Sequence, residues 1–553
     1  MASKIKVDTL ETANGSGSIT INNPINTAGI TSVTLGTSNF VAGVNAGNSI
    51  TSGGNYNVAV GDEAGTAITT GDSNTAVGYA ALDANTTASN NTAIGYNSLT
   101  ATTTGALNTA VGKGALEVNT TGAENTAVGA SALTSNTTGT NNTSNGSGSL
   151  YANTTGTSNV AMGLNALVAN TTASNNTAVG TFALTANTTG DYNSASGYQA
   201  LKANTTGLRN VATGANSLLS NTTGSYNTTM GVNSLNANTT ASNNTAVGYS
   251  SLNANTTGDT NTAVGKDSLK ANTTGTNNQA FGTRTLQANI SGSSNSAVGD
   301  LALSANTTGS TNAAVGQSAL RRNTTGINNT ATGYNTLQAN TTASGSTAIG
   351  NSALYSNVTG EDNTAVGNIA LYSATGRDNT GCGRASGYEV TTGNNNTLLG
   401  TNAGRSGSPS GSITSQNYRV CISDNNVTNA YVRVAWTVTS DQRDKADITS
   451  FTHGLDYING LRPVNYVWDN RSNYADGVSD GSKKKDLPQL GFLAQEIEAV
   501  ETSLGITNNC VVDKEDVDNL KITETKLIPI LVNAIKELSA KNDALETQNA
   551  TFA

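Results

Sequence analysis

Residues 74–90 read Asn-Thr-Ala-Val-Gly-Tyr-Ala-Ala-Leu-Asp-Ala-Asn-Thr-Thr-Ala-Ser-Asn, and close copies of this stretch fill most of the 553-residue chain. Glycine recurs at every seventeenth residue from Gly61 to Gly367, which makes 19 units in one unbroken phase. Leucine keeps the same spacing at all 18 positions from Leu82 to Leu371. A one-residue deletion near Ala374 shifts the phase, and two further units follow. A fixed period of this length indicates a stack of small repeats.

Each unit has the composition of one coil of a β-solenoid. Thr-Ala-Val is a short strand, the glycine after it permits a turn or a close backbone approach, and Asn-Thr-Thr-Gly is a turn. Leucine is the one large apolar residue of the unit, so its ladder is expected to form a core stripe. A helical array is excluded because one leucine in 17 residues makes no helical face, and Asn, Thr and Gly are poor helix formers.

The repeat resembles the head repeats of trimeric autotransporter adhesins, which have a similar Asn-x-x-Ala-Val/Ile-Gly core, and is similar to shaft repeats of phage tail fibres. This resemblance implies a mainly β, elongated β-solenoid or β-roll shaft in a homotrimer. It also implies three chains side by side, with their apolar stripes meeting near the axis.

Composition excludes several classes of protein. Only 35% of residues are hydrophobic and 11% are charged, too few for an ordinary globular core along the whole chain. The net charge of −9 argues against nucleic-acid binding. Cys382, Cys421 and Cys510 have no metal-ligand spacing, and with one histidine we expect no metal and no cofactor. We find no signal peptide and no membrane-spanning run, and therefore expect assembly in a cytoplasm without membrane insertion.

Changes in composition divide the chain into four segments. Residues 1–42 alternate apolar and polar in short runs and are expected to be an N-terminal cap or attachment segment. Residues 43–400 are the repeat shaft, and 401–439 are a β neck with expected strands at 418–422 and 431–438. Residues 440–553 hold 31 of the 63 charged residues and are expected to form a small α+β domain that ends in a helix.

The last segment carries motifs of a known family. These are Ser440-Asp-x-Arg-x-Lys445, Leu455-x-x-Ile-x-x-Leu-Arg-Pro463 with Trp468, Gly491-Phe-Leu-Ala-Gln-Glu496, and Lys526-Leu-Ile-Pro-x-Leu531. In this order they resemble the intramolecular chaperone, auto-processing domain at the C-terminus of phage tail spikes and fibres, first recognised in endosialidases. One departure is Asp444, where many members have an apolar residue before the lysine. An acid here favours the charged form of Lys445, which slows any reaction that needs it neutral.

Ser440 and Lys445 are the candidate catalytic pair. A serine hydroxyl needs an adjacent base, and a neutral lysine serves as one where desolvation or a neighbouring cation lowers its pKa. Positions i and i+5 lie on different faces of a helix, so we expect the pair to meet across a turn. Cleavage is expected between Thr439 and Ser440, with Ser440 as nucleophile and Lys445 as general base. Asp441 and Arg443 are expected to support the loop.

An alternative interpretation of the Ser-Asp pair is an ordinary helix cap. Further on, Phe492 and Leu493 are expected in the core, and His453 at a turn. The last helix is expected to present a heptad seam that alternates steps of four and three: Leu527, Leu531, Ala534, Leu538, Lys541, Leu545, Gln548 and Phe552. This seam either joins three chains or packs on its own domain.

The resemblance implies a structural tail fibre or spike protein of a phage, located in the virion tail. Its expected partners are two more copies of itself, other tail proteins and a bacterial surface receptor, either a glycan or an outer-membrane component. Any enzyme activity is expected to be a single self-cleavage. Two alternatives stay open. One is a glycan-degrading tail spike with the same tail, which needs paired carboxylates and aromatics in a groove. The other is a cell-surface trimeric adhesin.

Overall fold

The computed structural model describes residues 36–552, except 425, 428–430, 432, 434–437, 472–473, 508–509, 516 and 519. The chain forms two compact units, Met1–Ser344 and Gly345–Ala553, and each is described by itself. The strands expected in 1–35, and most of the strand expected over 431–438, lie outside the described residues.

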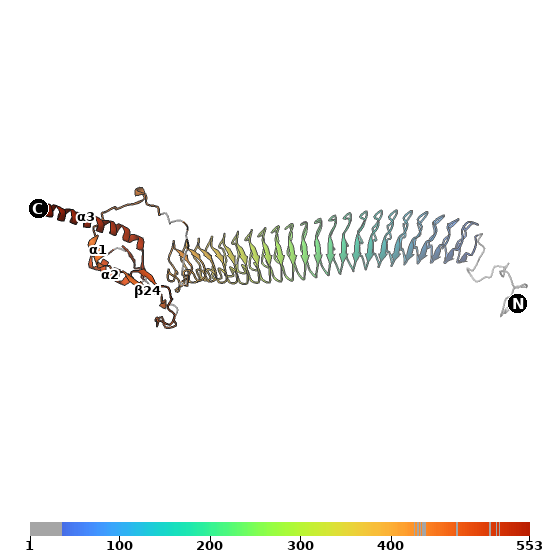
Figure 1. Ribbon diagram of the computed structural model, residues 1–553. Helices are drawn as coiled ribbons and strands as arrows, with labels where there is room; N and C mark the ends of the chain where they lie inside the picture. The colour runs from blue at the N-terminus through green and yellow to red at the C-terminus, as the bar shows by residue number, and fades with distance from the viewer. Residues whose placement is uncertain are drawn as a thin grey trace, which may run out of the picture. The chain divides into compact units, whose positions relative to one another are not determined.

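The first unit is a succession of three-residue strands joined by short turns, visible as repeated coils in Figure 1. The strands are β1 (Phe40–Ala42), β2 (Val58–Val60), β3 (Thr75–Val77), β4 (Thr92–Ile94), β5 (Thr109–Val111), β6 (Thr126–Val128), β7 (Thr143–Asn145), β8 (Val160–Met162), β9 (Thr177–Val179), β10 (Ser194–Ser196), β11 (Val211–Thr213), β12 (Thr228–Met230), β13 (Thr245–Val247), β14 (Thr262–Val264), β15 (Gln279–Phe281), β16 (Ser296–Val298), β17 (Ala313–Val315) and β18 (Thr330–Thr332).

Successive strands pair in parallel with a shift of one repeat, for example Thr75 with Thr92. The first step alone is one residue longer, since Phe40 pairs with Val58. In the second unit the parallel pairing continues through β19 (Thr347–Ile349), β20 (Thr364–Val366), β21 (Thr380–Cys382), β22 (Thr397–Leu399) and β23 (Val420–Ile422). The last step is longer than a repeat, since Thr397 pairs with Val420. The deletion near Ala374 is absorbed in the turn between β20 and β21. The predicted β-solenoid with a 17-residue period is confirmed.

The leucine ladder lies inside the coil of a single chain. Leu82, Leu99 and the other repeat leucines have no exposed surface, and the alanine at the centre of most strands is also buried. Each leucine adopts a left-handed backbone conformation, such as φ +50° at Leu150, which costs about 1–2 kcal/mol. Burying the side chain contributes about 1.5–3 kcal/mol and offsets that cost. The leucines therefore cannot be the stripes that meet between three chains, and that expectation was wrong for them.

Two ladders of asparagine share the interior with the leucines. One precedes the strands and includes Asn125, Asn142 and Asn159; the other lies in the Asn-Thr-Thr turns and includes Asn136 and Asn153, and all are fully buried. Asn142 Nδ2 donates to Asn125 Oδ1 (3.1 Å) and to the Gly156 carbonyl (2.9 Å). Its own Oδ1 accepts from the backbone N–H of Asn159 at 3.0 Å. The amides thus satisfy buried backbone groups from one coil to the next.

The glycine after each strand is needed for close approach of neighbouring coils. Gly146 has φ +149°, and a Cβ added there would lie 2.4 Å from the carbonyl oxygen of Gly163. The expectation of a turn or close backbone approach at this position is therefore confirmed. A larger residue would push two coils apart.

The rest of the second unit is a small α+β domain, with its helices labelled in Figure 1. Its elements are η1 (Gln442–Asp444), α1 (Leu455–Gly460), β24 (Val464–Tyr466), β25 (Gln489–Gly491), α2 (Ala494–Ser503), β26 (Val512–Asp513), β27 (Lys521–Ile522), η3 (Glu524–Lys526) and α3 (Leu527–Phe552). β24 pairs antiparallel with β25, and β26 with β27. The expected passage from strand to helix after Gly491 is confirmed.

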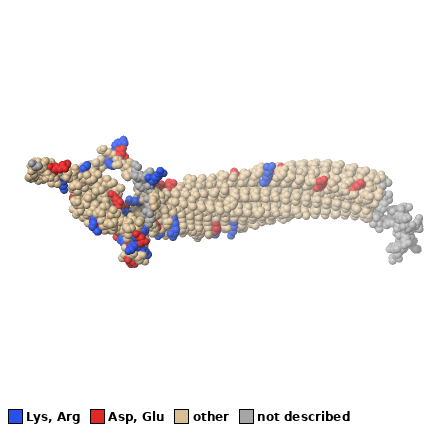
Figure 2. Space-filling model, in the orientation of Figure 1, with Lys and Arg blue, Asp and Glu red and all other residues tan. Residues whose placement is uncertain are grey.

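The core of this domain consists of Tyr457, Ile497, Val511, Val512, Leu527 and Ile530. Phe492 packs against it and is partly buried. The expectation that Leu493 is core was wrong, because this residue is exposed at the position just before α2. Most of the charged residues visible in Figure 2 belong to this domain, whereas the visible face of the first unit is mainly uncharged.

We predict that Asn142→Ala loosens the coils around it. The change leaves the buried N–H of Asn159 without its partner and removes one of the two donors to the carbonyl of Gly156, at a cost of about 1–3 kcal/mol. Amide hydrogen exchange in β7 and β8 should accelerate accordingly. Asn145→Ala, at the exposed end of β7, the strand that Asn142 precedes, is the matched control. Equal exchange in the two variants would contradict a structural role for the ladder.

Candidate functional site

Ser440 and Lys445 lie at the two ends of one helical turn. The 3₁₀ turn η1 spans the residues between them, with Asp441 as its N-cap and Lys445 as its C-cap. The Lys445 backbone N–H donates to the Gln442 carbonyl at 3.1 Å and closes the turn. Both interpretations of the sequence are thus present together: the aspartate caps the turn, and the turn brings serine and lysine together.

The lysine ammonium contacts the serine directly. Lys445 Nζ lies 2.5 Å from Ser440 Oγ, so the pair meets across a turn as expected from its spacing. Thr439, Ser440 and Lys445 are all exposed in the single chain. An exposed ammonium is strongly hydrated and charged, whereas a lysine base must be neutral. The geometry of a dyad is therefore present, while its desolvation is not supplied by the described residues of this chain.

Asp441 and Arg443 form a closed pair beside the dyad. Arg443 donates to the Asp441 carboxylate from its backbone N–H (2.9 Å), from Nε (3.1 Å) and from Nη2 (2.6 Å). The side-chain bond from Arg443, followed by the backbone bond, holds the pKa of Asp441 below its ordinary value. Both residues order the loop, in keeping with their expected supporting position.

The comparisons with known proteins concern this part of the chain. Residues 440–506 match the family described as Chaperone of endosialidase. They form a chaperone-of-endosialidase domain. The match starts at Ser440, the first residue of the dyad, and ends just after α2. Comparisons with the curated proteins and with the solved structures find no match to this chain.

Two hydrogen bonds tie the segment after the dyad to α3. Glu537 Oε2 accepts from the Leu455 backbone N–H at 2.9 Å, at the start of α1. Asn533 Nδ2 donates to the Phe451 carbonyl at 2.7 Å. Sequence reasoning missed both residues, because nothing in the pattern of α3 shows which face will meet α1. They make the helix a direct support of the chaperone domain.

Glu501 is a buried carboxylate that sequence reasoning also missed. It has no exposed surface, and its Oε1 accepts from Tyr457 Oη at 3.0 Å and from the Val511 backbone N–H at 2.7 Å. Burial, together with this carboxylate, raises the pKa of Tyr457 and of the Cys510 thiol. The sequence holds one signal of this burial: Glu501 lies four residues after Ile497 and therefore on the same, buried face of α2. Glu501 joins α1, α2 and β26.

Other polar contacts in the domain lie at its surface. Arg462 pairs with Glu496, which lies in the first turn of α2. His453 Nδ1 lies 2.7 Å from Asp456 Oδ2, and this bond holds the pKa of Asp456 below its ordinary value. The histidine lies directly before Gly454, the N-cap residue of α1.

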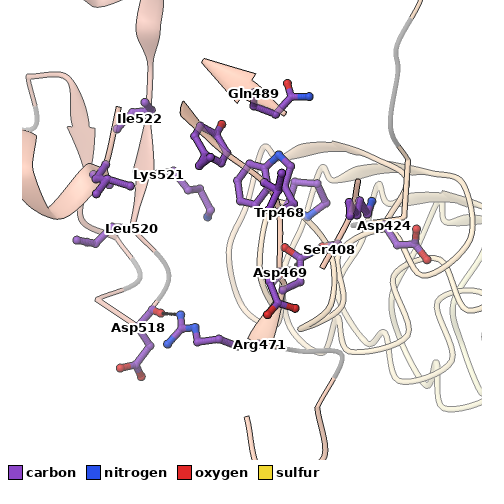
Figure 3. A pocket seen from close by; sticks show the side chains of 18 of the residues that line it. Ser408, Asp424, Trp468, Asp469, Arg471, Gln489, Asp518, Leu520, Lys521 and Ile522 are labelled. Carbon is purple, nitrogen blue, oxygen red and sulfur yellow. Dashed lines mark hydrogen bonds between the residues drawn. The ribbon is translucent and has the colours of Figure 1, made fainter. Parts of the chain in front are cut away.

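The second unit also contains a cavity of about 1390 Å³, shown in Figure 3. Trp468 lies in the middle of this view, and it makes an edge-to-face contact with Tyr466 at 5.4 Å between ring centroids. Arg471 donates to the Asp518 carbonyl on another wall. Asp469, which also lines the cavity, accepts from Tyr474 Oη at 2.6 Å and from the Gly481 N–H. These contacts order loops, and we assign the cavity no catalytic role.

Within the described part of the chain, no group of three or more His, Cys, Asp or Glu residues is arranged to hold a metal ion. Among the same residues, no helix combines the length and the hydrophobicity required to cross a bilayer.

We predict that Glu501→Ala destabilises the chaperone domain by about 1–3 kcal/mol, because it strands a buried hydroxyl and a buried backbone N–H. Ser503→Ala, an exposed change on the same helix, should leave stability within about 0.5 kcal/mol of wild type. Urea unfolding followed by the fluorescence of Trp468 measures the difference. Overlapping curves for the two variants would argue against this role of Glu501.

Proposed function

We propose that this protein is a structural fibre or spike of a phage tail, whose chaperone-of-endosialidase domain directs the assembly of three chains and then detaches itself. The β-solenoid forms the shaft, and cleavage between Thr439 and Ser440 separates it from residues 440–553. The observation that carries the proposal is the 2.5 Å contact between Ser440 Oγ and Lys445 Nζ at the first residues of that domain.

The cleavage chemistry uses only this dyad and water. Neutral Lys445 takes the proton from Ser440 Oγ, which attacks the carbonyl carbon of Thr439. The new C–O bond replaces the peptide C–N bond, and the amine of Ser440 leaves with the proton from the lysine. Water then hydrolyses the Thr439 ester and restores the serine hydroxyl. The products are a carboxylate at Thr439 and a free amine at Ser440.

A ladder of outward-facing apolar residues in the first unit supports association of chains. The third residue of most strands is Val, Ile, Met or Phe, and it points away from the coil interior. Met162, Val298 and Val315 are each more than 40% exposed. Exposed apolar side chains that recur on one face favour contact with another protein surface. These strand residues, and not the leucines, are the ones available to a neighbouring chain.

For the assembled shaft we propose binding to a bacterial surface receptor, with other tail proteins as further partners in the virion. Turn residues such as Thr, Asn and Tyr present polar and aromatic groups on each coil. A repeated surface of this kind offers many equivalent weak contacts, which is an effective way to hold a repetitive receptor such as a surface glycan.

We predict that full-length protein expressed in bacteria appears as two fragments that meet at Thr439 and Ser440. Ser440→Ala and Lys445→Ala should each leave an intact chain, because one removes the nucleophile and the other the base. Lys445→Arg should also stay intact, since arginine keeps its proton. Intact-mass analysis decides the outcome. Fragments with the same ends in any of these variants would refute the dyad.

We further predict that Asp444→Asn speeds self-cleavage about threefold, because the lost negative charge no longer favours protonated Lys445. Asp447→Asn removes the same charge further along the chain and should change the rate less. The measurement is the appearance of fragment over time for the two variants and the wild type under the same conditions. Equal rates for Asp444→Asn and the wild type would contradict an effect of this charge on the dyad.

A further inference from the structure

Three neighbouring coils of the first unit carry a column of aromatic and cationic side chains. Tyr192, Arg209 and Tyr226 take the same position in successive repeats, directly before the buried asparagine that precedes the strand. The guanidinium carbon of Arg209 lies over both rings, 5.7 Å from the centroid of Tyr192 and 5.6 Å from that of Tyr226. Its Nη1 also donates to Tyr226 Oη at 3.1 Å. The arginine is thus held between two tyrosines on the surface of the shaft.

The coil itself does not require these three side chains. Their backbones are left-handed, with φ +59°, +55° and +60°. Asn175 and Asn243 occupy the same position in the repeats on either side, and each has φ +61°. Asparagine adopts this conformation more readily than tyrosine or arginine, so the local backbone favours asparagine here. The column is therefore not explained by the folding of the coil, which indicates a contact with another molecule.

Arg209 is a cation in an almost uncharged part of the chain. Residues 125–258 contain only three charged side chains, Asp191, Lys202 and Arg209. The carboxylate of Asp191 accepts from the backbone N–H of Ser174 at 2.7 Å. Among the residues that the structure describes, no carboxylate lies within ion-pair distance of Arg209. Its positive charge is therefore left to solvent or to a bound anion.

The same coils hold a second contact between a cation and an aromatic ring. Lys202 Nζ lies 5.7 Å from the ring centroid of Phe182, and Lys202 also lines an open cavity of about 480 Å³. In the described part of the first unit, all cation–aromatic contacts fall within residues 182–226. This chemistry is thus concentrated in a short part of the shaft.

The remaining donors of Arg209 match an anion. A guanidinium has its five N–H donors in one plane, and a carboxylate or phosphate accepts two of them side by side. The rings lie over the two faces of this plane and one donor bonds to Tyr226, so the other donors are left at the edge of an exposed side chain.

The two tyrosines add surface for a sugar. Tyr192 and Tyr226 are 56% and 50% exposed, so their rings and hydroxyl groups are open to a ligand. A ring with an apolar body and a polar tip contacts molecules in which C–H and hydroxyl groups lie side by side, as they do in sugars. The three residues together therefore offer partners for a negative charge and for the sugar that carries it.

The asparagine ladder holds the column in place before any ligand binds. Asn210 Nδ2 donates to Asn193 Oδ1 at 3.2 Å, and Asn227 Nδ2 donates to Asn210 Oδ1 at 3.1 Å. These buried amides directly follow the three residues of the column in the sequence. Because the coils that carry the column are fixed, little order has to be gained on binding.

We propose that Tyr192, Arg209 and Tyr226 bind an anionic sugar unit of a bacterial surface polysaccharide. The edge of the Arg209 guanidinium holds the carboxylate or phosphate group of that unit, and the two tyrosines contact its ring and hydroxyl groups. This inference rests on the proposed binding of the shaft to a surface glycan, and it adds the chemical class of the glycan and the place where it binds.

The test measures binding of the full-length protein to biosensor surfaces that carry polygalacturonate, a glycerol-phosphate teichoic acid or neutral dextran. The wild type should bind at least one of the two anionic polymers about tenfold more tightly than dextran. Arg209→Asn should lose about this factor, because it removes the charged pair of hydrogen bonds. Arg209→Lys should lose nearly as much, since lysine keeps the charge without the planar pair of donors. Tyr192→Asn and Tyr226→Asn should each weaken binding about threefold.

The variants are matched to the repeat. Asparagine at these positions is compatible with the coil, because the neighbouring repeats carry it there. Arg322→Ala is the control: it removes the same charge from another exposed position of the shaft, where Ala305 and Ala339 stand in the adjacent repeats. This variant should bind like the wild type. Competition with free galacturonate or with glycerol phosphate distinguishes a carboxylate from a phosphate ligand.

The outcomes separate this site from the proposed function. Equal binding of the anionic polymers by the wild type and Arg209→Asn overturns the site. An equal loss in Arg322→Ala also overturns it, because general charge attraction would then be sufficient. A wild type that binds dextran as tightly as the anionic polymers overturns the anionic site but not glycan binding, and one that binds none of the three overturns the site as well. The tail-fibre role is decided separately, by the fragments that meet at Thr439 and Ser440.

Discussion

The hydrogen bonds of buried asparagines between coils are the interaction on which the shaft depends. A 17-residue coil buries a leucine and an alanine, which is too little apolar surface to hold it alone. The amides of residues such as Asn142 and Asn153 bond both to the next asparagine and to turn carbonyls. The buried amides of each coil thus fix the position of the next coil. Within one chain the register between neighbouring coils is therefore fixed. A shift of one residue would place another side chain where the buried asparagine amide has to lie.

The same regularity gives no information about alignment between chains. Two shafts that differ by a whole repeat would present nearly identical surfaces to each other, since the outward strand residues recur with the period of the coil. Any discrimination has to come from a region without the repeat. The chaperone domain is such a region, and it holds α3 through Glu537 and Asn533 at fixed places on α1 and the segment before it. A unique end therefore supplies the reference that a periodic shaft lacks.

Much of the architecture could be predicted from the 17-residue period of the repeat. The spacing of glycine and leucine gave the coil, the strand and the buried ladder. The role of asparagine was missed, because a pattern shows that a residue recurs and not which partner it meets. The left-handed leucines were missed because this conformation is unfavourable locally and arises only from the closed coil. Contacts that join distant segments, such as Glu501 with Tyr457, leave almost no trace in the sequence.

The candidate site, too, could be predicted only in part. The five-residue spacing from Ser440 to Lys445 and the motifs around it were enough to predict a meeting across a turn. The seam expected along α3 was wrong at Leu527 and Ala534, because an apolar pattern alone does not show that these two residues face inward against the domain. Ala534 and Ile535 differ little in a helical pattern, yet one is buried and the other 66% exposed.

Exposure of the dyad would connect the two activities proposed for the domain, cleavage and assembly. A lysine base needs a dry surrounding, and the described residues of one chain leave Lys445 in water. Under the proposed function, the burial would come from a second copy of the same domain. Phe451 and Leu455 are bonded to α3, so the segment that follows the dyad is tied to this helix. If the dyad reacts only when it is buried, and if it is buried only when chains assemble, the cleavage would follow the alignment of the chains.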